Sequence, residues 1–232
     1  MRGFLAARGE EAEYESLGRE YASESVYEIN KLMEEYEMAN ETSVATGECR
    51  LSYVNLLKPV APRGGGDEKY SVTVLIPKAD TMTKQRIDAA ISYAKAAGKD
   101  KRWDGVIPPI VAEPIHDGDG ARPSDGMPYG PECKGHWVVN ARAGADHKPE
   151  VVDSMGQPII DPTEIYSGMY GRVYLTFYPY NANGKKGVGC ALGPVMKTRD
   201  GEVLGGGSVS AASAFGVQAP PVIDPITGYP KA

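Results

Sequence analysis

The chain has 232 residues, 41% of them hydrophobic and 24% charged, which is ordinary for a soluble globular protein, and its 28 Gly and 18 Pro indicate a turn-rich β architecture. No run of about 18 apolar residues occurs, so no membrane-spanning helix is expected. Three scattered cysteines exclude a disulfide framework. The formal net charge of −6 argues against a nucleic acid partner only until its distribution is considered.

The acidity is concentrated near the N-terminus. Residues 10–41 contain eleven glutamates against two cations, a net charge of −9, whereas residues 42–232 carry +1. Ser25 and Glu28 form a capping box, and apolar residues follow at helical spacing. We therefore expect residues 1–41 to be an acidic helical extension that precedes the main domain.

Alternation of apolar and polar residues predicts five strands in the rest of the chain. The expected strands are residues 46–54, 69–76, 135–142, 169–181 and 186–197. In the first strand, Tyr53 should face the core together with Cys49 and Leu51. A helix capped by Asp80 should run from residue 80 to 97, with its apolar stripe on one side.

The segments between these elements are rich in turn residues. Residues 98–134 contain many Pro, Gly and Asp and predict a long irregular connection, and residues 151–160 predict a small hairpin. A short helix should begin at the Asp161-Pro-Thr-Glu164 sequence, which combines a cap with a first-turn proline. Residues 201–232, with a glycine run and several prolines, predict a flexible tail.

The stretch from Gly168 to Arg199 carries the strongest local signal. Asn183-Gly184 predicts a two-residue hairpin turn, which sets the register of the two strands. The pairs expected on the core face are Phe177 with Cys190, Leu175 with Leu192 and Val173 with Pro194. The pairs expected on the outer face are Tyr180 with Gly187, Tyr178 with Gly189, Thr176 with Ala191 and Tyr174 with Gly193.

The outer face of this hairpin combines aromatic rings with positive charge. Each of its paired tyrosines has a glycine beside it, so the ring has room to lie flat, and the stretch contains five cations but no Asp or Glu. Rings for bases and cations for phosphates are the parts of a single-stranded nucleic acid platform. Aromatic residues beside glycine also stabilise a sheet without any ligand, so both interpretations stay open at this point.

Potential metal ligands suggest two weaker alternatives. Cys133 and His136 have the spacing of half a zinc site, which His147 or Asp146 could complete. A hard cation for a nuclease could be held by Asp117, Asp119 and Asp125. No second paired ligand motif supports zinc, and Asp-Gly runs are more often plain turns. We therefore expect no metal, no other cofactor and no catalysis.

Several stretches together resemble the OB-fold single-stranded-DNA-binding proteins of tailed phages and prophages. They are Tyr53-Val-Asn-Leu, Tyr70 to Lys78, Asp117-Gly-Asp, Tyr166-Ser-Gly-Met-Tyr-Gly-Arg172, Asn183-Gly-Lys-Lys-Gly and Arg199-Asp-Gly-Glu. The resemblance spans about residues 46–207. It implies a mainly β protein with a five-stranded OB barrel over residues 42–200, in which the helix at 80–97 is an insertion.

The resemblance also implies a function. The expectation is a non-enzymatic, sequence-independent single-stranded-DNA-binding protein that acts in phage DNA replication, recombination and repair in the cytoplasm of a bacterial host. Expected partners are single-stranded DNA, phage replication or recombination proteins, and further copies of the chain that coat the strand together. A phage structural or protein-interaction module is the main alternative, and the nuclease is the weaker one.

The residues expected at the DNA lie on the predicted strands and on the two loops that an OB fold uses, Lys58 to Glu68 and Asn181 to Lys186. The expected phosphate contacts are Arg50, Lys58, Arg63, Lys69, Arg142, Arg172, Lys185, Lys186, Lys197 and Arg199. The expected base-stacking residues are Trp137, Tyr170, Tyr174, Tyr178 and Tyr180.

Overall fold

The computed structural model describes residues 41–62, 65–182 and 184–204. The strands are β1 (Ser43–Ala45), β2 (Cys49–Val60), β3 (Lys69–Pro77), β4 (Ile115–Asp117), β5 (His136–Gly144), β6 (Val151–Val152), β7 (Tyr170–Ala182) and β8 (Lys185–Arg199). The helices are α2 (Thr81–Lys101) and the 3₁₀ turns η1 (Pro131–Cys133) and η2 (Pro162–Glu164). In this part of the chain no helix is long and apolar enough to cross a membrane.

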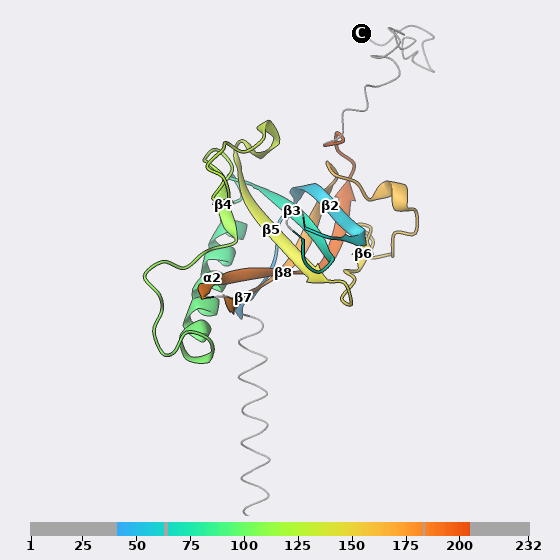
Figure 1. Ribbon diagram of the computed structural model, residues 1–232. Helices are drawn as coiled ribbons and strands as arrows, with labels where there is room; N and C mark the ends of the chain where they lie inside the picture. Colours follow the sequence, from blue (N-terminus) through green and yellow to red (C-terminus); the bar gives the residue numbers. More distant parts are fainter. Residues whose placement is uncertain (1–40, 63–64, 183, 205–232) are drawn as a thin grey trace, which may run out of the picture.

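Five strands close into a ring in the order β2, β3, β5, β8, β7 and back to β2 (Figure 1). Neighbours in the ring are antiparallel except β5 and β8, which run parallel where Arg142 lies opposite Ala191. A small five-stranded barrel of this kind is the OB fold, so the predicted fold class is confirmed. The short strands β1 and β4, which the sequence pattern did not reveal, attach to β7 and β5. The short strand β6 attaches to β8 and lies in the small hairpin predicted at residues 151–160, where Val152 pairs with Pro158.

The β7–β8 hairpin has almost the predicted register. Every predicted pair from Ala182 opposite Lys185 to Leu175 opposite Leu192 is present, and Gly184 has the positive φ of 76° that the turn requires. Val173, however, lies opposite Val195 and not Pro194. The cause is a β-bulge, because between the two pairs β8 contains one residue more than β7.

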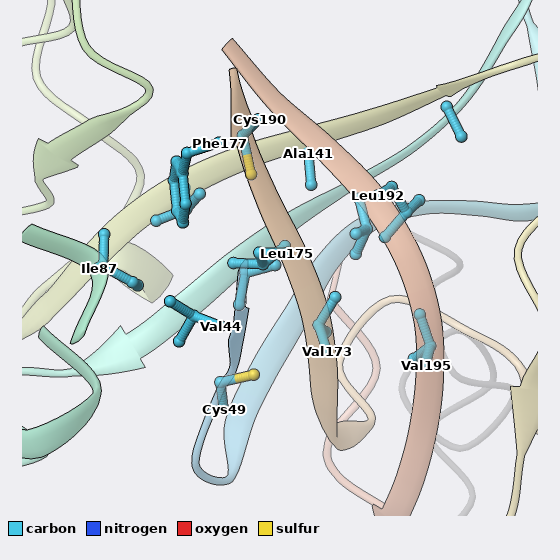
Figure 2. Close-up of a cluster of buried hydrophobic side chains, with 14 of the residues drawn as sticks. Val44, Cys49, Ile87, Ala141, Val173, Leu175, Phe177, Cys190, Leu192 and Val195 are labelled. Atoms are coloured by element: carbon cyan, nitrogen blue, oxygen red, sulfur yellow. The ribbon is translucent and has the colours of Figure 1, made fainter. Parts of the chain in front are cut away.

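The barrel core is built from the inward residues of these strands. Figure 2 shows Val173, Leu175 and Phe177 of β7 next to Cys190, Leu192 and Val195 of β8, and all six are at most 7% exposed. Burial raises the pKa of the Cys49 thiol to about 12. All three cysteines are free, as their scattered positions predicted, and they are buried as neutral, largely apolar side chains.

The inserted helix α2 covers part of the same core. It begins after Asp80, whose carboxylate accepts a hydrogen bond of 3.0 Å from the backbone N–H of Thr83, as predicted, and it continues beyond the predicted end. Its buried residues include Ile87, Ile91 and Ala94. Just after the helix, Trp103 is 1% exposed and donates its indole N–H to the carbonyl of Tyr180 at 3.0 Å, which ties α2 to the far end of β7.

The first predicted strand is interrupted and its prediction for Tyr53 is wrong. Residues 46–48 bend between β1 and β2, and β2 then continues to Val60. Cys49 and Leu51 face the core as expected, whereas Tyr53 is 67% exposed. The register between β2 and β3 shifts between Ser52 and Asn55, and Tyr53 has a φ of 47°, so a bulge reverses the direction of its side chain.

A second, smaller apolar cluster lies on the outer side of the barrel. Leu75 of β3 and Val138 of β5 pack there with Cys133 of η1, and Tyr129 and Leu204 cover them. The long connection before β5 is therefore anchored, although most of it is irregular as predicted. The expected N-terminal helix, Arg63 and the expected tail beyond residue 204 lie outside the described residues.

Candidate nucleic-acid interface

The outer face of β2, β3 and β5 is polar where the small apolar cluster ends. Hydrogen bonds link its side chains in cross-strand pairs: the Asn55 amide donates to Ser71 Oγ at 3.1 Å, and Thr73 Oγ1 donates to Asn140 Oδ1 at 2.8 Å. These residues lie opposite or beside one another in the ladders of the ring. Such pairs fix the side chains that line this face.

A groove follows this face and consists of two adjoining hollows. The central hollow is lined by Tyr53, Ser71 and Thr73, and the tyrosine hollow by Tyr178 and Tyr180. Both hollows share Lys69, Asn140 and Arg142. The groove therefore runs from Tyr53 on β2 across two cations to the tyrosine row on β7.

In the tyrosine hollow the rings lie against glycines as predicted. A Cβ atom at Gly189 would come within 2.6 Å of the Tyr178 ring, and one at Gly187 within 2.5 Å of the Tyr180 hydroxyl. Tyr178 is 46% exposed, so one side of its ring covers backbone and the remainder is accessible. Partial burial raises the pKa of the Tyr178 hydroxyl, which stays neutral and does not repel phosphate.

Tyr53 is a groove residue that the alternation pattern missed. Reading strict alternation through residues 46–54 places it inward, and only the bulge turns it outward. A non-glycine residue at positive φ is uncommon in a strand and often marks a functional position. No signal in the local sequence distinguishes it from an inward tyrosine.

Three of the predicted DNA-contacting residues form a separate stack away from the groove. The Arg199 guanidinium lies 3.4 Å from the centre of the Tyr170 ring, and Arg50 lies 5.9 Å from it on β2. Glu48 accepts hydrogen bonds from Thr198 and Arg199, and these bonds hold the pKa of its carboxyl below the ordinary value. This stack joins β2, β7 and β8, and within it the charge of Arg199 is paired with Glu48.

Lys197 is also engaged within the protein. It is 9% exposed, and its ammonium lies 2.8 Å from Asp200 and 3.4 Å from Glu164. Burial alone would lower the pKa of Lys197, but the hydrogen bonds and charges of these two carboxylates raise it. Arg172 donates from Nε to the Thr46 carbonyl at 3.0 Å, although its side chain is exposed.

The remaining predicted residues lie around the barrel. Trp137 packs beneath the ammonium groups of Lys78 and Lys84, at 5.1 and 4.6 Å, and does not line the groove. Tyr174 is 40% exposed farther along β7, beside β1. At the ends of the strands, Lys58 and Lys185 are exposed, and Lys186 forms a long ion pair with Asp104 at 3.3 Å.

The alternative metal sites are not assembled. Lys78 bridges Asp117 and Asp119 at 2.6 Å each, whereas Asp125 pairs with Arg122 at 2.9 Å. Cys133 is buried, and His136 contacts the Lys134 carbonyl at 2.7 Å. Among the described residues no three His, Cys, Asp or Glu side chains form a group that could hold a metal ion.

The fold and the groove define a class: an OB-fold protein with a basic, tyrosine-bearing face. Comparison with known proteins gives the family. The family model described as "Enterobacter phage Enc34, ssDNA-binding protein" matches residues 42–222, so the chain belongs to this family of phage single-stranded-DNA-binding proteins.

Individual relatives agree with this assignment. The chain is 30% identical over 174 residues to the "Putative protein p50" of Acyrthosiphon pisum secondary endosymbiont phage 1, covering 72% of this chain and 88% of that protein. It is similar to the single-stranded DNA-binding protein from bacteriophage Enc34 in complex with ssDNA, with a TM-score of 0.59, 30% identity and coverage of 71% of this chain and 90% of that one. A second structure of the Enc34 protein matches with a TM-score of 0.58, 28% identity and coverage of 75% and 90%.

Proposed function

We propose that this protein binds single-stranded DNA in the groove, largely without regard to sequence, and that it does so during phage DNA replication, recombination and repair. The observation that carries the proposal is the continuity of the groove, in which Lys69 and Arg142 lie between Tyr53 at one end and Tyr178 with Tyr180 at the other. Membership in the phage single-stranded-DNA-binding family supports it.

The roles of the residues follow from their chemistry. Lys69 and Arg142 contact phosphates, and the exposed Lys58 and Lys185 add positive charge near the groove ends. Tyr53, Tyr178 and Tyr180 stack on bases. Stacking is tolerant of sequence because every base has a flat face.

The role of the protein is to bind and not to cleave. Asp117, Asp119 and Asp125 are engaged with Lys78 and Arg122, which supports a turn-forming role for this acidic run. We expect magnesium and EDTA to leave a bound strand intact and its affinity unchanged.

A titration of the whole chain with labelled oligonucleotides tests the proposal. Fluorescence anisotropy with single-stranded DNA, duplex DNA and single-stranded RNA should show the tightest binding to single-stranded DNA, weakening as salt is raised. Replacing Lys69 and Arg142 together with Ala should weaken binding strongly. A matched control is Arg86→Ala, an exposed cation of α2 outside the groove. Equal losses in both variants would contradict the groove assignment.

A further inference from the structure

A third hollow adjoins the groove at Tyr53. It has a volume of about 660 Å³ and shares Tyr53 and Asn55 with the central hollow. Its far wall is formed by Gly130, Glu132, Ser167 and Leu204. We call it the Glu132 hollow. A DNA strand that leaves the central hollow past the exposed Tyr53 ring would enter this space.

The backbone that carries Glu132 is anchored in the wall of this hollow. Glu132 belongs to η1, where the adjacent Cys133 is 5% exposed and packs with Leu75 and Val138 in the small apolar cluster. Its carboxylate lies directly over Gly130, where a Cβ atom would collide with both carboxylate oxygens. Among the described residues, none forms a hydrogen bond or ion pair with this carboxylate, unlike Glu48, which binds Thr198 and Arg199.

A free carboxylate decides which part of a DNA strand enters the hollow. It repels phosphates, so the nucleotide that occupies this space must present its base. The open acceptors of the carboxylate then favour a base with donors on its edge. Guanine alone carries two adjacent donors on its Watson–Crick edge, N1–H and N2–H, and these match the two oxygens of a carboxylate. Adenine, cytosine and thymine present at least one acceptor beside each donor.

We infer that the Glu132 hollow is a base subsite that prefers guanine, with Glu132 accepting from the guanine edge and Tyr53 stacking on a neighbouring base. The inference rests on the proposed function, since it needs a strand in the groove. The subsite adds a preference for guanine at the Tyr53 end of the groove, whereas binding along the rest of the groove is tolerant of sequence. The subsite also gives the strand a fixed register relative to the protein.

The test compares repeat oligonucleotides of about 16 nucleotides, in which dT alternates with dG, with dA or with deoxyinosine, together with oligo-dT. The wild-type chain should bind the dG repeat about fivefold or more tightly than the dA repeat. The deoxyinosine repeat, whose base lacks the N2 amino group, should lie between them. Glu132→Gln should bring the three repeats close together, while its affinity for oligo-dT stays the same or rises.

A matched control is Glu164→Gln, which alters a carboxylate outside the groove and the Glu132 hollow that is already paired with Lys197. This variant should keep the guanine preference. Melting curves establish that both variants are folded, and the deoxyinosine comparison on the wild-type chain needs no variant at all.

The outcomes separate the two proposals. If the wild-type chain binds no single-stranded DNA, the proposed function fails. If it binds the dG, dA and deoxyinosine repeats equally, or if folded Glu132→Gln keeps the preference, binding stands and the guanine subsite is overturned.

Discussion

Phe177 and Tyr178 are neighbours in β7 with opposite surroundings. Phe177 is 1% exposed in the barrel core, whereas Tyr178 is 46% exposed in the tyrosine hollow. We expect Phe177→Ala to cost about 3–5 kcal/mol of folding free energy, as core Phe truncations do. Tyr178→Ala should instead cost about 1–3 kcal/mol of DNA binding for each base that loses its stacking partner.

Melting and affinity measured on both variants check this contrast. The ring of Tyr178 also covers Gly189, so a small loss of stability in Tyr178→Ala is expected. If Tyr178→Ala melted early and its folded fraction bound DNA as tightly as the parent, the ring would serve the sheet alone.

Arg142 and Lys197 differ in what their charges contact. Arg142 is exposed in the groove, and Lys197 is buried against Asp200 and Glu164. Removing one phosphate contact from a single-stranded site lowers the salt dependence of binding by about 0.7 in log-log slope. We expect this change for Arg142→Ala.

Lys197→Ala should leave that slope unchanged and lower the melting temperature, because two carboxylates lose their partner. Binding titrations at four or more salt concentrations measure the slope, and thermal melts measure stability. If Lys197→Ala reduced the salt dependence of binding and left the melting temperature unchanged, Lys197 would be a phosphate contact after all.

At the scale of elements, ion pairs hold the start of the connection that leads from β4 to β5. Lys78, next to β3, contacts Asp117 and Asp119, and Asp119 also accepts from the Gly135 N–H at 3.0 Å. Hydrogen bonds from Lys78, then from backbone N–H groups, lower the pKa of both carboxyls. Groups with a lowered folded-state pKa stabilise the fold above their unfolded value and lose this contribution as they are protonated at lower pH.

We therefore expect part of the stability to disappear as the pH falls from about 5 toward 2. Asp119→Asn should be less stable than the parent at neutral pH, and the difference should shrink in acid. Urea midpoints at pH 7 and pH 3 measure it. The effect is modest because both carboxylates are about half exposed. A difference that does not change with pH would contradict the assignment to this charge cluster.

At the scale of the whole molecule, the acidic charge precedes the described barrel in the sequence. Residues 1–40 carry ten glutamates and four cations, so they account for the entire net charge of −6. Contacts with the barrel are present from Thr42, just before β1, where the Thr42 carbonyl accepts from the Phe177 N–H at 2.8 Å. We propose that residues 1–40 are an extension that the barrel does not need for folding.

Removing residues 1–40 should leave a cooperatively melting protein that binds single-stranded DNA at least as tightly, because the deleted charge repels phosphates. The gain should be largest at low salt, where screening is weakest. Melting curves and titrations at two salt concentrations test this. Loss of folding would mean that the apolar stripe of this segment belongs to the core.

The amino-acid sequence by itself determined the parts of this protein that depend on neighbouring residues. Alternation and the Asn183-Gly184 turn predicted which residues of β7 and β8 face the core and which tyrosines meet glycines, because both features act over a few residues. The Asp80 cap predicted the start of the helix for the same reason. The barrel was predicted from the resemblance to phage proteins, which spans about residues 46–207.

Only the tertiary structure decided which of the predicted residues share a groove. Lys69 and Arg142 meet because β3 pairs with β5. Arg199 is engaged by the distant Glu48, and Lys197 pairs with the distant Glu164 in addition to its sequence neighbour Asp200. Tyr53 faces outward because of a bulge that no local pattern reveals. Partners brought together by folding decide whether a charge or a ring remains available, and that information is absent from any short stretch of sequence.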